Sequence, residues 1–152
     1  MLSQEEVDIL NQTKGRILAV DFGDTRTGLA VSDVSRFLAS GIGYVSPGGI
    51  EKTADKVAEV AQEQSAVAVV VGLPKNMDGS EGFRAERCRE FANLLRERLG
   101  EVQVFMMDER LTTVSASRYL NETNTRGVKR KGVIDTLSAQ ILLQNTLDRL
   151  KF

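Results

Sequence analysis

The sequence contains no histidine at all. This absence excludes Ser-His-Asp and Cys-His nucleophile systems, acid–base catalysis by histidine and histidine-ligated metal sites. A hydrolase of this composition must therefore activate water through carboxylates, a lysine, or a metal ion held by oxygen ligands.

Cysteine is nearly absent as well. The single cysteine, Cys88, excludes an internal disulfide and a multi-cysteine zinc site, and it favours a reducing, cytoplasmic location. The N-terminus is acidic and lacks the basic region and apolar core of a signal peptide. No apolar run approaches the roughly 18 residues of a membrane span. We therefore expect a cytoplasmic protein with no membrane partner.

The net charge is only −1, which argues against a protein that coats nucleic acid non-specifically. One segment nevertheless stands out: residues 124–132, NTRGVKRKG, contain four basic residues and no acid. We expect a loop there. A local basic patch of this kind can hold a phosphate backbone. A solvated loop without a partner is the alternative interpretation.

Hydrophobic periodicity predicts an α/β protein with one domain over residues 1–152. Three short strands open the chain, helices and strands then alternate, and two helices close it. This order predicts a mixed five-stranded sheet with helices on both faces. The expected strands are 16–22, 27–33, 39–46, 66–74 and 102–108, and the expected helices are 3–10, 49–64, 83–100, 112–122 and 133–150.

Two local expectations concern the ends of these elements. Gly23, in the turn GDTR, is expected to use the positive φ that glycine tolerates best. In the helix over 83–100, Phe83, Cys88 and Phe91 are expected to face the core, with the arginines outward.

Carboxylates occur where strands end. Asp21 closes the first strand, Asp108 and Glu109 close the last, and Asp135 lies one turn inside the final helix. In open α/β sheets, sites form at strand ends where the strand order reverses. Taken singly, each acid also has a structural interpretation as a turn former, a helix cap or an ion-pair partner.

Convergent carboxylates repel one another unless a cation lies between them. Oxygen ligands without histidine suit Mg²⁺ or Mn²⁺. Two such ions about 4 Å apart would hold the attacking water and the leaving oxygen of a phosphodiester. The acids together therefore predict a site for two divalent metal ions.

Four stretches resemble the successive motifs of the YqgF family, also called RuvX. They are AVDFGDTRTGLAVSD, VVVGLPKNMDGSEGFRAE, DERLTT and KRKGVIDTLSAQILLQ, and the resemblance extends over about residues 16–148. It implies an RNase H-like fold related to the junction resolvase RuvC. It also implies a nuclease that trims the 5′ end of precursor 16S ribosomal RNA, with cleavage of four-way DNA junctions as the alternative.

The same resemblance assigns the site. Asp21, Glu109 and Asp135 take the catalytic, metal-binding positions, and Asp108 is a fourth candidate ligand. The strand over 66–74 ends without the glutamate that RuvC-type enzymes place there, so Asn76 or Glu109 would have to supply that function.

Two segments, 74–82 and 124–131, would flank the site and hold the phosphate backbone of the substrate, precursor rRNA or branched DNA. Ribosomal particles are a further expected partner. Aromatic residues make up only 5% of the chain, and tryptophan is absent. Recognition of backbone and shape is therefore expected, rather than stacking of unpaired bases. The candidate nucleic-acid-binding residues are Lys75, Asn76, Arg84, Arg110, Arg126, Lys129, Arg130 and Lys131.

Two other function classes compete with a nuclease. ATP-binding proteins of the actin, Hsp70 and sugar-kinase group also follow a strand with Asp-x-Gly, but they close two such lobes over the nucleotide, and this chain has one. A non-catalytic binding module with the same fold is the second. Loss of cleavage with retained binding in Asp21→Asn would exclude that module.

Overall fold

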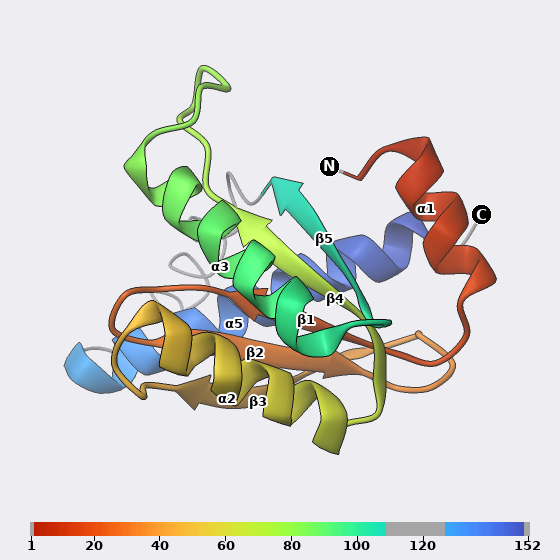
Figure 1. The fold of residues 1–152 in the computed structure, drawn as a ribbon, viewed down its shortest axis with the longest axis horizontal. Helices are drawn as coiled ribbons and strands as arrows, with labels where there is room; N and C mark the ends of the chain where they lie inside the picture. Colours follow the sequence, from red (N-terminus) through yellow and green to blue (C-terminus); the bar gives the residue numbers. More distant parts are fainter. Residues whose placement is uncertain (1, 109–126, 151–152) are drawn as a thin grey trace.

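A five-stranded mixed sheet with helices on both faces forms the framework of the protein (Figure 1). The computed structural model describes residues 2–108 and 127–150, and the side chains of all of these except 127–135. The strand order is β3-β2-β1-β4-β5, in which β1 is antiparallel to β2 and parallel to β4. The predicted mixed sheet is thus confirmed. The strands are β1 (Arg16–Asp21), β2 (Thr27–Ser32), β3 (Ala39–Val45), β4 (Ala66–Leu73) and β5 (Gln103–Asp108).

The helices form two layers around the sheet. α2 and α3 cover one face, while α5 crosses the other, with α1 beside its C-terminal end (Figure 1). Among the described residues, no helix combines the length and the apolar character that a bilayer crossing requires. The described helices are α1 (Gln4–Gln12), α2 (Ile50–Glu63), α3 (Phe83–Leu99) and α5 (Gly127–Arg149).

The continuous apolar run of β4 reflects burial on both faces, as expected for a strand inside an α/β sheet. Val69 and Val71 belong to the core under α2 and α3. Ala68 and Val70 belong to the core under α5 and α1. The alternation along each strand therefore shows which face every side chain occupies.

Local capping signals in the sequence are also confirmed. Ser3 and Glu6 form the predicted capping box at the start of α1, with Glu6 N donating to Ser3 Oγ at 3.1 Å and Ser3 N donating to Glu6 Oε1 at 2.9 Å. α3 ends at Gly100, whose φ of 61° closes the helix as predicted.

The expected boundary of the last helix is wrong. α5 begins at Gly127 rather than at residue 133, so Lys129, Arg130 and Lys131 lie in its first turns and not in a loop. Lysine and arginine have high helix propensity, and Gly132 alone does not break a helix whose later turns pack on the sheet. The helix expected over 112–122 falls outside the described residues.

Candidate active site

Asp21 lies at the carboxyl end of β1, between two partner strands. It pairs with Gly28 of the antiparallel strand β2, and its neighbour Val20 pairs with Val71 of the parallel strand β4. Its side chain is half-buried. Alternation from the buried Ala19 places it on the α5 face, where Gly28 opposite has no side chain to crowd it. Pairing on both sides therefore fixes the backbone that carries this carboxylate at the carboxyl end of β1.

Gly23 keeps the turn after Asp21 tight, but not for the expected reason. Its φ is not positive; instead, a Cβ built on it would lie 2.3 Å from the carbonyl oxygen of Arg26. Thr27 Oγ1 closes the same turn, donating to Gly23 O at 3.3 Å and accepting from Gly23 N at 3.4 Å. The glycine is needed for space.

Asp108 occupies the matching end of β5, beyond β4. Leu73 of β4 pairs with Asp108, and Gly72 pairs with Met107. Met107 belongs to the core under α5, whereas Val104 belongs to the core under α2 and α3. Alternation therefore places Asp108 on the face opposite to that of Asp21. The two acids share a sheet edge but not a face.

The N-terminal half of α5 extends toward the Asp21 edge. Gln144 and Gln140 bind the backbone of Ala39, while Thr136 contacts Gly41 farther along β3. The first turns of the helix thus continue toward the end of β1 (Figure 1). They carry the positions of Lys129, Arg130, Lys131 and Asp135.

Residue 135 lies in the third turn of α5, not in its first. It precedes Ser138 and Ala139, both buried against the sheet, by three and four positions, so it occupies the sheet-facing side of the helix. The structure thus brings the Asp135 position to the face that also carries Asp21. Glu109, Arg110 and Arg126 fall outside the described residues.

A close contact between Gly41 and α5 fixes the height of the helix above the sheet. A Cβ on Gly41 would lie 2.6 Å from Thr136 Cγ2 and 3.2 Å from Gln140 Oε1. Sequence reasoning missed this contact. The glycines of residues 39–45 were visible as a signal, but the helix that covers them is set by tertiary structure.

We expect Gly41→Ala to lift α5 away from the sheet and to lower the free energy of unfolding by about 1–2 kcal/mol. Overpacking costs about 1–3 kcal/mol, and replacing a glycine within a strand by alanine stabilises the protein by about 0.5–1 kcal/mol. Cleavage should fall by up to about 100-fold if the helix positions Asp135, since a misplacement of about 1 Å can cost that much. Urea unfolding and a cleavage assay measure the two effects.

The matched partner change is Thr136→Ser, which removes only the Cγ2 methyl and keeps the hydroxyl. In the double variant Gly41→Ala/Thr136→Ser, we expect both stability and cleavage to recover most of their loss. An unchanged Gly41→Ala protein, or a double variant that is no better than Gly41→Ala, would show that this contact does not set the position of the helix.

The loop over 74–82 is internally ordered and tied to α3. Asn76 Nδ2 donates to Ser80 Oγ at 2.9 Å, and Asn76 N donates to Ser80 O at 2.8 Å. Arg89 donates to both carboxylate oxygens of Glu81, at 2.7 and 2.8 Å, which lowers the pKa of Glu81. The amide nitrogen of Asn76 therefore serves the loop itself. Its suggested function in place of a RuvC-type glutamate stays a prediction.

Two of the predicted cations lie near this loop. Lys75 is half-exposed and close enough to Glu81 to contribute to the lowered pKa of that carboxyl. Arg84 is exposed on the first turn of α3, and no ion pair joins it to another residue within the described ranges. Both are therefore available to a phosphate backbone that passes this edge.

The donor chemistry at the edge fits a hard divalent cation. Asp21 offers carboxylate oxygens at a fixed strand end, and the chain has no histidine that would favour a softer metal. Within residues 2–108 and 136–150, no three acidic or cysteine side chains are grouped to hold a metal. Any group of three such side chains at Asp21 would therefore include a residue outside these ranges, and Glu109 and Asp135 stay the predicted ones.

The strand order and the covering helices give the chain an RNase H-like fold. Thermus thermophilus RuvC, in complex with a Holliday junction substrate, superposes with a TM-score of 0.57 at 16% identity, covering 90% of this chain and 96% of that one. The fowlpox virus resolvase, also in a junction DNA complex, superposes with a TM-score of 0.52 at 12% identity, covering 87% and 98%.

The chain belongs to the RuvX family, described as "Holliday junction resolvase", which matches residues 15–149. A relative from Ruminiclostridium cellulolyticum is 41% identical over 136 residues, covering 89% of this chain and 95% of the relative. One from Myxococcus xanthus is 44% identical over 133 residues, covering 88% and 87%. Both relatives carry the name "Putative pre-16S rRNA nuclease". The predicted family and fold are thereby confirmed.

Proposed function

We propose that this protein is a metal-dependent nuclease that processes the 5′ end of precursor 16S rRNA. The observation that carries the proposal is the placement of Asp21 at the carboxyl end of β1, on the same face as the turns of α5 that include Asp135 and the basic run. The names of the relatives support the substrate. Asp21, Glu109 and Asp135 are the proposed catalytic ligands, with two Mg²⁺ or Mn²⁺ ions as cofactor.

The proposed metal-binding and phosphate-binding functions belong to residues at different positions. Asp21, whose backbone is fixed by pairing to β2 and β4, is proposed to supply the central metal ligand. Bound divalent ions would lower the pKa of an attacking water and neutralise charge on the phosphate. Lys75 and Arg84 on one side, and Lys129, Arg130 and Lys131 on the other, are proposed to hold the flanking phosphates. Arg110 and Arg126 complete the proposed cationic set.

Asp108 stands apart from this arrangement because its side chain belongs to the opposite face of the sheet. We therefore assign cleavage to the other three acids. Its function as a fourth ligand stays a prediction. In Asp108→Asn, a large loss of cleavage would indicate a metal ligand, and a loss of stability with normal cleavage would indicate a helix or turn cap.

Cleavage of four-way DNA junctions is the second candidate function. The family description and the RuvC-like fold both favour it. Resolution of a junction requires two cuts and thus two active sites, so this activity predicts a dimer. Light scattering of the purified protein, with and without junction DNA, measures that state directly.

One assay separates the two functions. Purified protein is given a labelled precursor-rRNA 5′ leader and a labelled four-way DNA junction, each with Mg²⁺, Mn²⁺ or EDTA, and ribosomal particles are added in a parallel series. We expect metal-dependent cutting of the RNA that EDTA abolishes. Cutting of the junction alone would favour the resolvase, and no cutting of either substrate would contradict a nuclease.

A further inference from the structure

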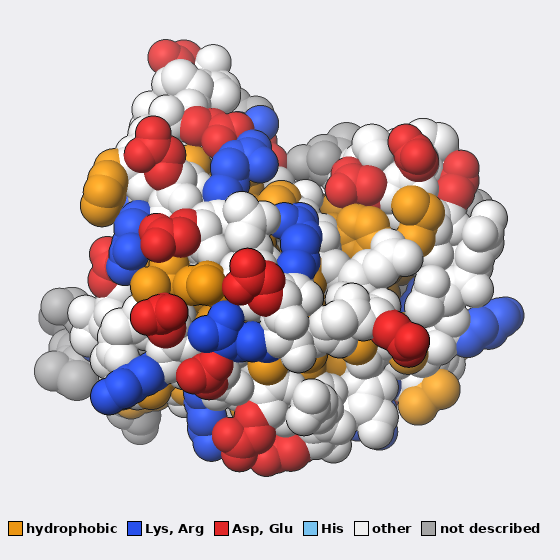
Figure 2. Space-filling view, viewed as in Figure 1, with side chains coloured by type: hydrophobic (Ala, Val, Ile, Leu, Met, Phe, Trp, Pro, Cys, Tyr) orange, Lys and Arg blue, Asp and Glu red, His pale blue; other side chains and the backbone are white. Residues whose placement is uncertain are grey.

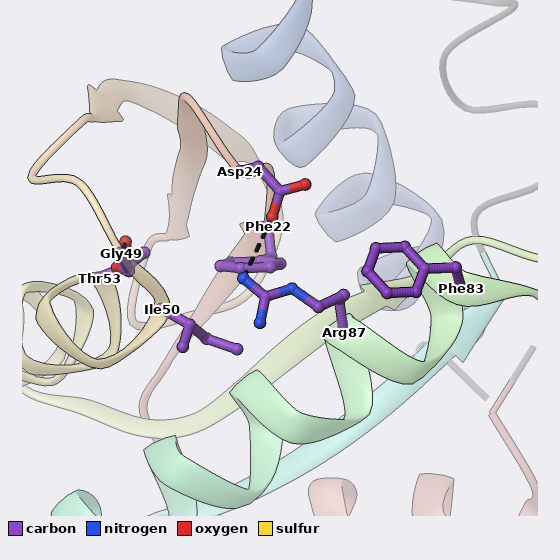
Figure 3. Close-up of a pocket in the computed structure, with 7 residues that line it drawn as sticks. All are labelled: Phe22, Asp24, Gly49, Ile50, Thr53, Phe83 and Arg87. Atoms are coloured by element: carbon purple, nitrogen blue, oxygen red, sulfur yellow. Dashed lines mark hydrogen bonds and ion pairs between the residues drawn. The ribbon is translucent and has the colours of Figure 1, made fainter.

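A pocket of about 310 Å³ opens on the other side of the same sheet edge (Figure 3). It lies between the β1–β2 turn and the first turns of α2 and α3. Phe22 forms part of its wall and directly follows Asp21, so the pocket and the proposed catalytic carboxylate are neighbours on opposite faces. Its lining residues are Phe22, Asp24, Gly49, Ile50, Thr53, Phe83 and Arg87.

Phe22, Ile50 and Phe83 form the apolar part of the pocket wall. Phe22 is buried, and its ring stacks on that of Phe91 with centroids 4.6 Å apart. Phe83 was expected to face the core, but its exposed fraction is 70%. It is the first residue of α3 and lies beside the pocket, whereas the buried side chains of the helix begin at Ala85. An exposed aromatic ring therefore stands at the rim of a preformed pocket.

Arg87 makes two long ion pairs beside the pocket, one of them with the lining residue Asp24. Arg87 Nη2 lies 3.4 Å from Asp24 Oδ1, and Arg87 Nη1 lies 3.4 Å from Glu90 Oε2. The guanidinium reaches between Phe22 and Ile50, with Phe83 on the α3 side (Figure 3). Donor and acceptor groups thus lie next to each other, in the arrangement that the edge of a nucleobase can meet.

The charge around the pocket opposes a phosphate. Acidic and basic side chains are interspersed over α2 and α3, with apolar patches between them (Figure 2). Arg87 already faces two carboxylates, and Asp24 would meet any anion that enters. A flat, uncharged group with hydrogen-bonding edges fits this surface better than a phosphate does.

We propose that this pocket receives one unstacked base of the nucleic-acid strand whose phosphate lies at Asp21, with Phe83 as the stacking platform and the Arg87–Asp24 pair at the base edge. The proposal rests on the proposed nuclease function and extends it: the substrate is single-stranded beside the cut. The strand crosses the sheet edge from the α5 face to the α3 face. Recognition then includes base stacking, contrary to the expectation from the low aromatic content.

The test measures binding apart from cleavage. In the Asp21→Asn background, a single-stranded precursor-rRNA leader with 2-aminopurine at successive positions is titrated with protein carrying Phe83, Phe83→Ala or Phe83→Tyr. We expect Phe83→Ala to weaken binding by about 5- to 100-fold, since one base–aromatic stack has an effect of that size, and Phe83→Tyr to restore it. One 2-aminopurine position should report a change that Phe83→Ala abolishes.

Phe37→Ala is the matched control. Phe37 is exposed to a similar extent, 62%, but it lies in the β2–β3 loop at the opposite end of the sheet. We expect this variant to bind RNA like the parent. Equal losses in Phe37→Ala and Phe83→Ala, or normal binding in Phe83→Ala, would overturn the proposal.

Two further arms locate the ligand and separate the hypotheses. An abasic site at the reporting position should weaken binding to the Phe83 protein but not further weaken binding to Phe83→Ala. Competition by ATP that depends on Phe83, with RNA binding unaffected, would instead indicate a pocket for free nucleotides and would overturn the strand model. If proteins with Phe83 and with Phe83→Ala, both retaining Asp21, cleave and bind RNA equally, only the pocket proposal is contradicted. If binding depends on Phe83 but the wild-type protein cleaves no RNA, only the nuclease proposal is contradicted.

Discussion

Replacement of Asp21 by asparagine is expected to slow RNA cleavage by about 10³-fold without weakening RNA binding. Asparagine keeps the shape of the side chain at the end of β1, where pairing to β2 and β4 fixes the backbone. It removes the charge that a divalent ion requires. Loss of about 4 kcal/mol of transition-state stabilisation, within the several kcal/mol that a bound metal supplies, corresponds to about 10³-fold in rate. One negative charge fewer beside a polyanion also leaves binding equal or slightly tighter.

Cleavage rates under single-turnover conditions, together with binding measured in EDTA, test this expectation. Asp8→Asn is the matched control, because Asp8 is exposed on α1 and the same charge is removed far from the edge. Asp108→Asn is a second comparison. Because Asp108 lies on the opposite face of the sheet, we expect this substitution to slow cleavage by about tenfold or less. An Asp21→Asn protein that folds normally and cleaves at the wild-type rate would exclude the proposed site.

The framework could be predicted from the sequence because each element carries its own local signal. The strand β4 is apolar throughout, and Ser3 with Glu6 marks the start of α1. The position of Asp21 at a strand end follows from the same periodicity. Hydrophobic periodicity shows where a strand ends, and an acid at that end can be read from the sequence alone. Asp21 could therefore be predicted without knowing which distant segments meet in the fold.

The features that escaped prediction depend on contacts between distant segments. The fit of Thr136 over Gly41 joins residues 95 positions apart in the chain, and no local pattern encodes it. Phe83 continues the apolar spacing of α3, but it is the first residue of the helix and lies at the pocket, outside the core cluster. The pocket below it requires α2, α3 and the turn after Asp21 to meet, so the sequence alone could not show it.

Arg36 presents the largest expected effect on stability. Its side chain joins the β2–β3 loop to the end of α1 by donating to three backbone carbonyls: Leu10 O at 2.6 Å, Gly15 O at 2.7 Å, and Thr13 O. Leu10 lies in the last turn of α1, where its carbonyl also accepts from Thr13 N at 3.2 Å, and Thr13 is the C-cap; Arg36 thus adds donors where a helix has few of its own. A cation there also complements the helix dipole.

We expect Arg36→Ala to lower the free energy of unfolding by about 3 kcal/mol, which corresponds to a fall of about 6–12 °C in Tm. Hydrogen bonds to a charged donor contribute about 1.5–3 kcal/mol each, but the adjoining pocket of about 340 Å³ admits water to the freed carbonyls, so the sum is not reached. Urea unfolding of both proteins measures the difference. Cleavage below the melting temperature should stay near wild type, because Arg36 lies at the opposite end of the sheet from Asp21.

Two further substitutions separate the contacts of Arg36 from its backbone. Its φ of 63° is a conformation that glycine adopts readily, so Arg36→Gly should be about 1 kcal/mol more stable than Arg36→Ala. Arg36→Lys keeps the charge but not the planar fork that reaches three acceptors, so it should fall between wild type and Arg36→Ala. Burial lowers the pKa of Arg36, yet a guanidinium stays protonated near neutrality, so these differences should be equal at about pH 6 and about pH 8. A stability in Arg36→Lys equal to that of wild type would show that charge at the end of α1, and not the three-way hydrogen bonding, holds this helix to the sheet.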